Sequence, residues 1–290
     1  MKFKMEGHIN VPGGMVWYKI VGEKTNKLPI IVLHGGPGYP HNYLKPIENL
    51  SGERQVIFYD QLGCGKSDRP IDTKLWTVER FVAELAEIIK ILKLEQYHIL
   101  GQSWGAALAG AFALQKPKGL ISLIFADPYL STPVWMKDAK RLTELLSKDK
   151  QRSIEKHKKD GIETKEYKEA KRDYYKMFIR GYKRTPAEVI KSRIGTNNDI
   201  YNFMWGPTEF LATGTLKNFD LTPRLSEIKV SVLLVCGRFD EATPQALKHF
   251  KNLLFDADIK IFEKSAHSPH LTEKEEYIKT LRIFLRKVES

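Results

Sequence analysis

The feature that most constrains the fold of this chain is a Gly-x-Ser-x-Gly pentapeptide, GQSWG at 101–105, set between two contrasting stretches. A short apolar run at 97–100 precedes it, and an Ala-rich stretch at 104–116 follows it. The first is typical of a buried strand and the second of a helix. The flanking glycines let a strand and a helix approach without Cβ clashes, so a serine at this turn projects above the sheet. The pattern therefore predicts that Ser103 is a nucleophile at a strand-to-helix turn.

The rest of the chain alternates short apolar runs with helical patterns. Strands are predicted at 29–33, 55–59, 97–100, 120–126, 230–236 and 258–262. Thr77 can cap a helix in which apolar residues up to Leu92 recur at spacings of three and four. Further helices are expected after Pro244 and from 271 to about 285. Continuous apolar strands separated by helices predict an α/β fold, with a mostly parallel central sheet and helices on both faces.

One long segment interrupts this alternation. Residues 128–217 contain no convincing strand and are rich in Lys, Glu and Tyr, with helical patterns such as 139–146 and 167–179. Strand and helix patterns resume after it. We therefore predict a discontinuous core formed by 1–127 and 218–290, with residues 128–217 inserted as a helical cap, or lid.

The formal net charge of +12 raises the question of an anionic partner, such as nucleic acid or a membrane surface. The segment 128–217 has 20 Lys and Arg against 12 Asp and Glu, so it carries two thirds of the excess. Its acids and bases are interleaved, which is typical of solvated helix faces, and no nucleic-acid recognition motif accompanies them. We expect neither nucleic acid nor membrane as a partner. Two cysteines and the lack of a long apolar segment predict a cytoplasmic protein.

A serine hydroxyl attacks poorly at neutral pH unless an imidazole takes its proton and a carboxylate orients that imidazole. At a turn of this kind the chain order should be serine, acid, histidine. Only His249, His267 and His270 lie late enough in the chain. His267 follows the last predicted strand in a short loop, whereas His249 falls within a helix. We assign the base to His267 and keep His270 as the alternative.

Two aspartates could be the acid, because each stands at the carboxyl end of a predicted strand. Asp240 follows the strand at 230–236 in a Gly-Arg-Phe-Asp turn, and Asp127 precedes a proline. Asp240 is preferred because a glycine-containing turn precedes it and the histidine follows on the next strand. Asp127 is expected to cap the entry to the inserted segment. The predicted triad is Ser103, Asp240 and His267.

The tetrahedral intermediate of such a reaction needs two backbone donors around its oxyanion. One is the N–H of Trp104, directly after the nucleophile. The other should come from the glycine-rich turn HGGPG at 34–38, which follows the first predicted strand. Because glycine has no side chain, the backbone of this turn can lie beside a substrate carbonyl. The N–H of Gly36 is the predicted donor.

Five segments resemble those of proline iminopeptidases, also called prolyl aminopeptidases, including the tricorn-interacting aminopeptidases. They are HGGPG at 34–38, YDQLGCGKS at 59–67, GQSWG at 101–105, GPTEF at 206–210 and GRFDE at 237–241. The resemblance runs nearly end to end. It implies an α/β-hydrolase fold with a helical cap, hydrolysis after an N-terminal residue that is often proline, and the site roles assigned above. It alone suggests association with a larger protease complex.

The resemblance also implies roles for Glu209, in the inserted segment, and Glu241, beside the predicted acid. In similar enzymes these positions hold the free α-amino group of the substrate. An ammonium in a partly desolvated pocket is costly unless carboxylates counter it. An internal amide has no charge to place there, which favours an exopeptidase.

We therefore predict a serine aminopeptidase that acts on short peptides with a free N-terminus and requires no cofactor. The alternative among enzymes is an esterase, lactonase or small-amide amidase with the same triad, which would not need the two glutamates. A catalytically silent binding protein on this fold is the alternative from another class. His267 and His270 could suggest a metal site, but no third ligand is placed and no metal is expected.

Overall fold

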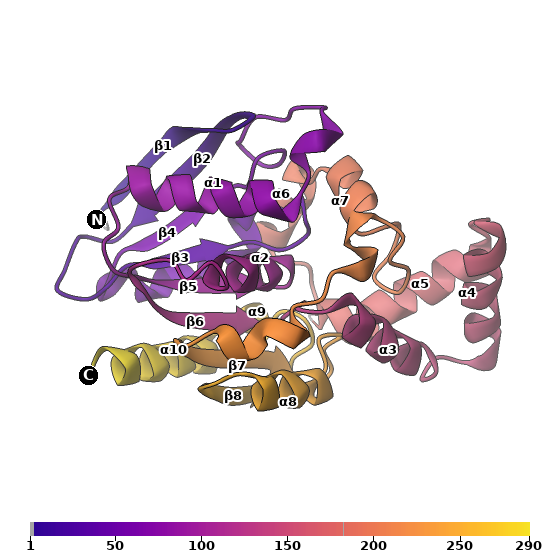
Figure 1. The fold of residues 1–290 in the computed structure, drawn as a ribbon. Coiled ribbons are helices and arrows are strands. Elements are labelled where there is room, and N and C mark those ends of the chain that lie inside the picture. The colour runs from indigo at the N-terminus through magenta and orange to yellow at the C-terminus, as the bar shows by residue number, and fades with distance from the viewer. Residues whose placement is uncertain (1–2, 182) are drawn as a thin grey trace.

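The computed structural model describes residues 3–181 and 183–290, and its centre is an eight-stranded sheet in the order β1-β2-β4-β3-β5-β6-β7-β8 (Figure 1). The strands are β1 Lys4–Val11, β2 Gly14–Val21, β3 Ile30–Leu33, β4 Val56–Tyr59, β5 Tyr97–Gln102, β6 Leu120–Ala126, β7 Ser231–Gly237 and β8 Ala257–Phe262. From β4 to β8 all neighbours pair in parallel. The predicted α/β fold with a mostly parallel sheet is confirmed.

The antiparallel edge of the sheet was not among the predictions. β1 and β2 form a hairpin in which Val11 pairs with Gly14, and β2 then pairs antiparallel with β4. Pro12 and Gly13 make the two-residue turn, and Gly13 has a φ of 100°, which only glycine adopts readily. In β1 the buried residues fall only in its second half, so the strand lacks the continuous apolar run of strands such as β3 and β4.

Both faces of the sheet are buried, as alternation along β3 demonstrates. Ile31 and Leu33 pack into one apolar cluster with helix α1, whereas Ile30 and Val32 pack into a second cluster with α10. The helices of the first face are α1 Val78–Ile91, α2 Trp104–Ala113 and α8 Pro244–Leu253; α10 Lys274–Glu289 and the 3₁₀ segment η1 His41–Gly52 cover the second. Thr77 caps α1 as predicted, because its side chain accepts from the Arg80 N–H.

Five α-helices lie between β6 and β7 in the described part of the chain. They are α3 Thr132–Thr143, α4 Lys148–Asp160, α5 Lys165–Tyr175, α6 Ala187–Gly195 and α7 Asn198–Met204. Figure 1 shows α4 and α5 projecting away from the sheet, on the side opposite both chain ends. We call these five helices the inserted helices.

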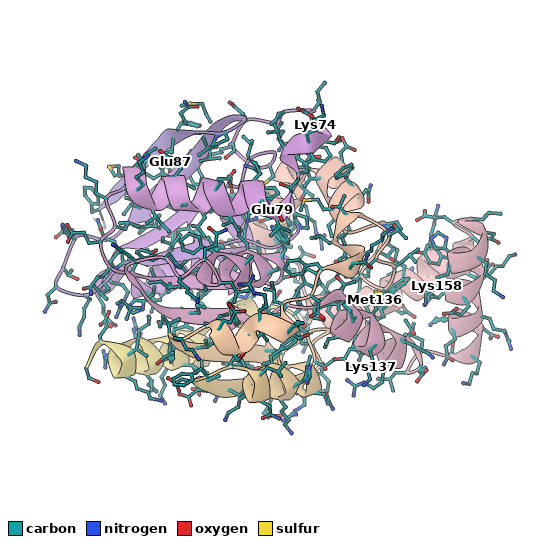
Figure 2. All side chains as sticks on the ribbon, viewed as in Figure 1. Lys74, Glu79, Glu87, Met136, Lys137 and Lys158 are labelled. Atoms are coloured by element: carbon teal, nitrogen blue, oxygen red, sulfur yellow. The ribbon has the colours of Figure 1, made fainter. Side chains whose placement is uncertain are left out.

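The charge of the inserted helices is partly paired within them. On α4, Lys158 Nζ lies 2.8 Å from Glu155 Oε1, and Lys150 forms an ion pair with Asp173 of α5. Lys137 on α3 and Lys158 carry part of this basic surface (Figure 2). Such pairs are what solvated helix faces contain, in agreement with the interpretation of the interleaved sequence. Among the described residues, none of the helices combines the length and apolar character needed to span a membrane.

Candidate active site

Ser103 lies at the tight turn between β5 and α2, with a φ of 54° and a ψ of −119°. A non-glycine residue is rarely found there, and such strain is typical of functional positions. A Cβ built on Gly101 would lie 2.1 Å from the Gly105 carbonyl oxygen, and one on Gly105 would lie 2.3 Å from the Leu33 carbonyl oxygen. The two glycines of the motif are therefore required sterically, as the sequence predicted.

His267 and Asp240 are in direct contact. The imidazole Nδ1 lies 2.6 Å from Asp240 Oδ1, and both side chains are buried. They come from the loops that follow β8 and β7, which are adjacent parallel strands and so bring their carboxyl ends together. Asp240 Oδ1 also accepts from the Ala242 N–H at 2.9 Å, which fixes the orientation of the carboxyl group.

Burial shifts the pKa values of both Asp240 and His267. Desolvation is the main cause that raises the pKa of Asp240, to about 7, against hydrogen bonds that favour its charged form. Desolvation also lowers the pKa of His267, partly opposed by the nearby acidic side chains of Asp127 and Glu209. The imidazole is therefore held in its neutral form, which is the form a general base requires.

One cavity joins most of the predicted site. It has a volume of about 790 Å³ and is lined by the predicted nucleophile, base, one oxyanion donor and both glutamates: Ser103, His267, Gly36, Glu209 and Glu241. Trp104 lines a second, smaller pocket that shares Gly36, Ser103 and Glu209 with the main cavity. Asp240 lies behind His267. The structure thus brings all seven predicted residues to the carboxyl edge of the parallel strands.

The alternative base, His270, has a different environment. It is fully buried, its ring lies against Tyr43 and Tyr277, and its two ring nitrogens have no hydrogen-bond partner among the described residues. Desolvation lowers the pKa of His270 to about 3. His249 is exposed on α8. Among these three histidines, which the structure describes, His267 alone combines access to the cavity with a carboxylate partner.

The prediction for Asp127 was wrong. Its side chain does not cap the inserted helices; Ser131 caps α3 instead, by accepting from the Val134 N–H. Asp127 is fully buried, and its carboxyl group accepts from Gln102 Nε2 at 3.4 Å. The reason is its left-handed backbone, with a φ of 47°, which turns the side chain back toward the site.

The glycine-rich turn at 34–38 lies against the nucleophile turn. A Cβ on Gly35 would lie 3.2 Å from Ser103 Cβ and 2.8 Å from Gln102 Oε1. Gly36 has a φ of 111°, and its N–H makes no hydrogen bond to any residue that the structure describes. A free backbone donor beside a nucleophile is what an oxyanion requires.

Glu209 and Glu241 line the cavity without a cationic partner. Neither forms an ion pair with a described residue, and Glu241 Oε2 has no hydrogen-bond partner there. Glu209 Oε1 accepts from the Tyr201 hydroxyl at 2.6 Å. Desolvation raises the pKa of both, and for Glu241 the charge of Glu209 adds to it. The charge of Lys171, which lines the same cavity, partly opposes this rise for Glu209.

Several residues around the site were not assigned to it from the sequence; Trp135 and Trp205 were expected to pack the inserted helices, with stacking against an apolar substrate as the alternative. Trp135 and Trp205 line the smaller pocket, and the Trp135 ring lies 6.0 Å from that of His267, centroid to centroid. Three bases, Lys171, Arg180 and Arg193, line the main cavity. No pattern in the sequence distinguished these residues, because the inserted helices contain many aromatic and basic residues that do not reach the cavity.

Comparison with known proteins agrees with this geometry. Residues 29–274 match the family described as the alpha/beta hydrolase fold, and the chain belongs to that class. A proline iminopeptidase from Heyndrickxia coagulans is 45% identical over 285 residues, which are 98% of this chain and 99% of the relative. The chain therefore belongs, within that class, to the proline iminopeptidase family.

Solved structures agree with this assignment. The crystal structure of a proline iminopeptidase from Mycobacterium smegmatis is 31% identical, with a TM-score of 0.91 and 98% of each chain covered. The crystal structure of VinJ is 32% identical, with a TM-score of 0.92, 98% of this chain and 99% of that chain covered. Both alignments include the inserted helices, since they span nearly the whole chain.

Proposed function

We propose that this chain is a serine aminopeptidase that removes the N-terminal residue, proline or another apolar residue, from short peptides. The observation that carries the proposal is the pair of glutamates, Glu209 and Glu241, which line the cavity of Ser103 and lack a cation. A peptide with a free amine brings the missing charge to the place where the bond is cut. The names of the relatives, proline iminopeptidase, support the same substrate class.

The reaction proceeds through an acyl-enzyme. Ser103 Oγ attacks the carbonyl of the N-terminal residue while His267 Nε2 takes the hydroxyl proton, and Asp240 stabilises the imidazolium at Nδ1. The N–H groups of Gly36 and Trp104 bind the oxyanion. His267 then gives its proton to the leaving amine of the shortened peptide. A water molecule, deprotonated by His267, finally releases the N-terminal residue from Ser103.

The carboxylates of Glu209 and Glu241 select substrates by charge. Burying them unpaired is unfavourable, and an ammonium between them relieves this cost only when the substrate has a free N-terminus. An N-acylated substrate or an internal amide leaves them uncompensated. Exopeptidase specificity follows from this difference.

The pocket beside Ser103 suits the side chain of the N-terminal residue. Trp135, Trp205 and Leu216 supply apolar surface, and Glu209 is at its edge. An apolar lining of this kind favours a compact apolar side chain, such as that of proline, over a charged one. The bases Lys171, Arg180 and Arg193 in the main cavity favour short peptides, whose terminal carboxylate they can counter.

Three further predictions belong to this proposal. The first is the division into a core of 1–127 and 218–290 with a cap of 128–217, which the position of the inserted helices supports. The second is a cytoplasmic location, which the free and buried thiols of Cys64 and Cys236 support. The third, association with a larger protease complex, stays a prediction of the family resemblance.

The test is a panel of chromogenic aminoacyl amides, proline included, each with a free or an N-acetylated amine. The proposal predicts turnover of the free-amine members only, with apolar residues preferred. Equal turnover of both forms, or turnover of simple esters alone, would instead indicate the esterase, lactonase or amidase alternative. Absence of turnover together with no labelling by a serine-directed phosphonate would indicate a binding protein.

A further inference from the structure

The carboxyl group of Asp127 lies in the second layer of the site, behind the triad. Asp127 directly follows β6, and its backbone N–H donates to the Val235 carbonyl of β7 at 2.7 Å. Asp127, Asp240 and His267 each bring a polar side-chain atom within 4.8 Å of the other two. All three side chains are buried. The triad acid therefore has a second carboxyl group as its immediate neighbour.

Two oxygens at this contact have no conventional partner. Asp127 Oδ1 and Asp240 Oδ2 are both buried and accept no hydrogen bond from a described residue. One carboxyl oxygen of each nevertheless lies within 4.8 Å of the other. Two ionised carboxylates at this distance repel, and a buried oxygen without a donor is costly. One proton between them satisfies both oxygens.

The surrounding hydrogen bonds determine which carboxyl group holds that proton. The Tyr43 hydroxyl accepts from the Gly35 N–H at 2.8 Å, so its own proton goes to Gln102 Oε1 at 2.5 Å. This orients Gln102 Nε2 toward Asp127 Oδ2, which must accept. Asp240 Oδ1 in turn receives donors from His267 and Ala242, as an ionised carboxylate does. The proton shared by the two carboxyl groups is therefore bound to Asp127 Oδ1.

We infer that Asp127 is a positioning residue that works as a neutral carboxylic acid. Its Oδ1–H donates to Asp240 Oδ2 while its Oδ2 accepts from Gln102. The hydrogen bond keeps Asp240 ionised and oriented toward His267, and no proton is transferred between the two aspartates during turnover. This role rests on the triad of the proposed function.

Every titratable group that faces Asp127 is compatible with one negative charge on the pair. The groups are His267 after β8, Cys236 in β7, Glu241 in the loop after β7, Tyr43 of η1 and Tyr277 of α10. Burial raises the pKa of the thiol and of both phenols well above their usual values, so these stay neutral. Burial first, and then the charge of Asp240, raises the pKa of Asp127.

The test compares Asp127→Asn and Asp127→Ala by the pH dependence of kcat on a prolyl amide. Asparagine reproduces the protonated acid, because its Oδ1 accepts from Gln102 and its Nδ2 donates to Asp240. Alanine removes the donor. We expect D127A to lower kcat by about 10- to 100-fold. The acid limb of the plot of kcat against pH should move about one pH unit upward, because the charged form of Asp240 loses a hydrogen bond. D127N should recover most of that loss and keep the acid limb of the parent protein.

The contrary outcomes are distinct. A downward move of the acid limb in D127N would show that Asp127 is ionised in the parent protein, because removing a like charge lowers the pKa of Asp240. A uniform drop in kcat in both variants, with no change in the limb, would reduce Asp127 to a structural role. If D127A fails to fold, D127N alone decides between these results. Asp60→Asn, a buried carboxylate bonded to His41, is the control for carboxylate loss outside the triad.

This experiment separates two kinds of failure. If Ser103→Ala retains full activity, the triad itself is wrong and the role of Asp127 falls with it. If Ser103→Ala is inactive but the limb behaves contrary to expectation, only the role of Asp127 is overturned. Melting temperatures of all variants identify any change that reflects folding alone.

Discussion

His267 Nδ1 and Asp240 Oδ1 lie 2.6 Å apart at the carboxyl ends of β8 and β7, with both side chains buried. His267 and Ser103 line the same cavity. Asp240 has its pKa raised to about 7, and the pKa of His267 is lowered. The pH dependence of the reaction should therefore report on the aspartate.

Activity is expected to rise with pH through about 7. Below that pH Asp240 is protonated and no longer stabilises the imidazolium, whereas His267 is neutral at and above it. The measurement is kcat at saturating prolyl amide from pH 5 to 9. A profile that stays flat down to pH 5 would show that Asp240 is ionised at far lower pH than its burial implies.

Glu241→Gln should selectively weaken substrates with a free amine. Removing a buried counter-ion costs about 3–5 kcal/mol at the upper end, so kcat/KM should fall by two orders of magnitude or more. Rates on N-acetylated substrates, already low, should change little. Glu79→Gln, at an exposed position on α1, is the matched control (Figure 2). An unchanged ratio between the free and acetylated series would count against the amine site.

Gly105→Ala should strongly destabilise the fold. The new methyl group would lie 2.3 Å from the Leu33 carbonyl oxygen, a backbone atom that cannot move without disturbing β3. We expect a loss of about 3 kcal/mol or more in the free energy of unfolding, measured with urea. Gly52→Ala is the control, because its Cβ would meet nothing within 4 Å, and its effect should stay within about 0.5 kcal/mol. Equal effects of the two changes would refute the steric account of the motif.

The parts of the site that were predicted are those in which the local structure depends only on residues within one short segment. The glycines around Ser103 are needed because strand and helix backbones touch there, and the motif contains them at fixed spacing. The strands from β3 to β7 were found because each is a mostly apolar run buried on both faces. In β8, at the sheet edge, Ile259 and Ile261 alternate with Asp258 and Lys260. The strand β1 was not predicted, because only alternate residues of its second half are buried.

The unpredicted parts depend on which loops meet. The contact of Asp127 with Asp240 exists because β6 and β7 pair in a register that aligns their ends, and no local pattern encodes that register. Gln102 stands within the motif, yet its role depends on Tyr43 from another element. The same applies to Trp135 and Trp205, which reach the site only once the inserted helices are packed.

Covalent labelling shows whether Ser103 attacks a residue that is held by its free amine. The reagent is a diphenyl phosphonate analogue of proline with a free amine, and peptide mass spectrometry locates the adduct. We expect one adduct, on Ser103, that is absent from Ser103→Ala and forms much more slowly when the reagent is N-acetylated. An adduct on another residue, or labelling of Ser103 at equal rates by the free and acetylated reagents, would contradict it.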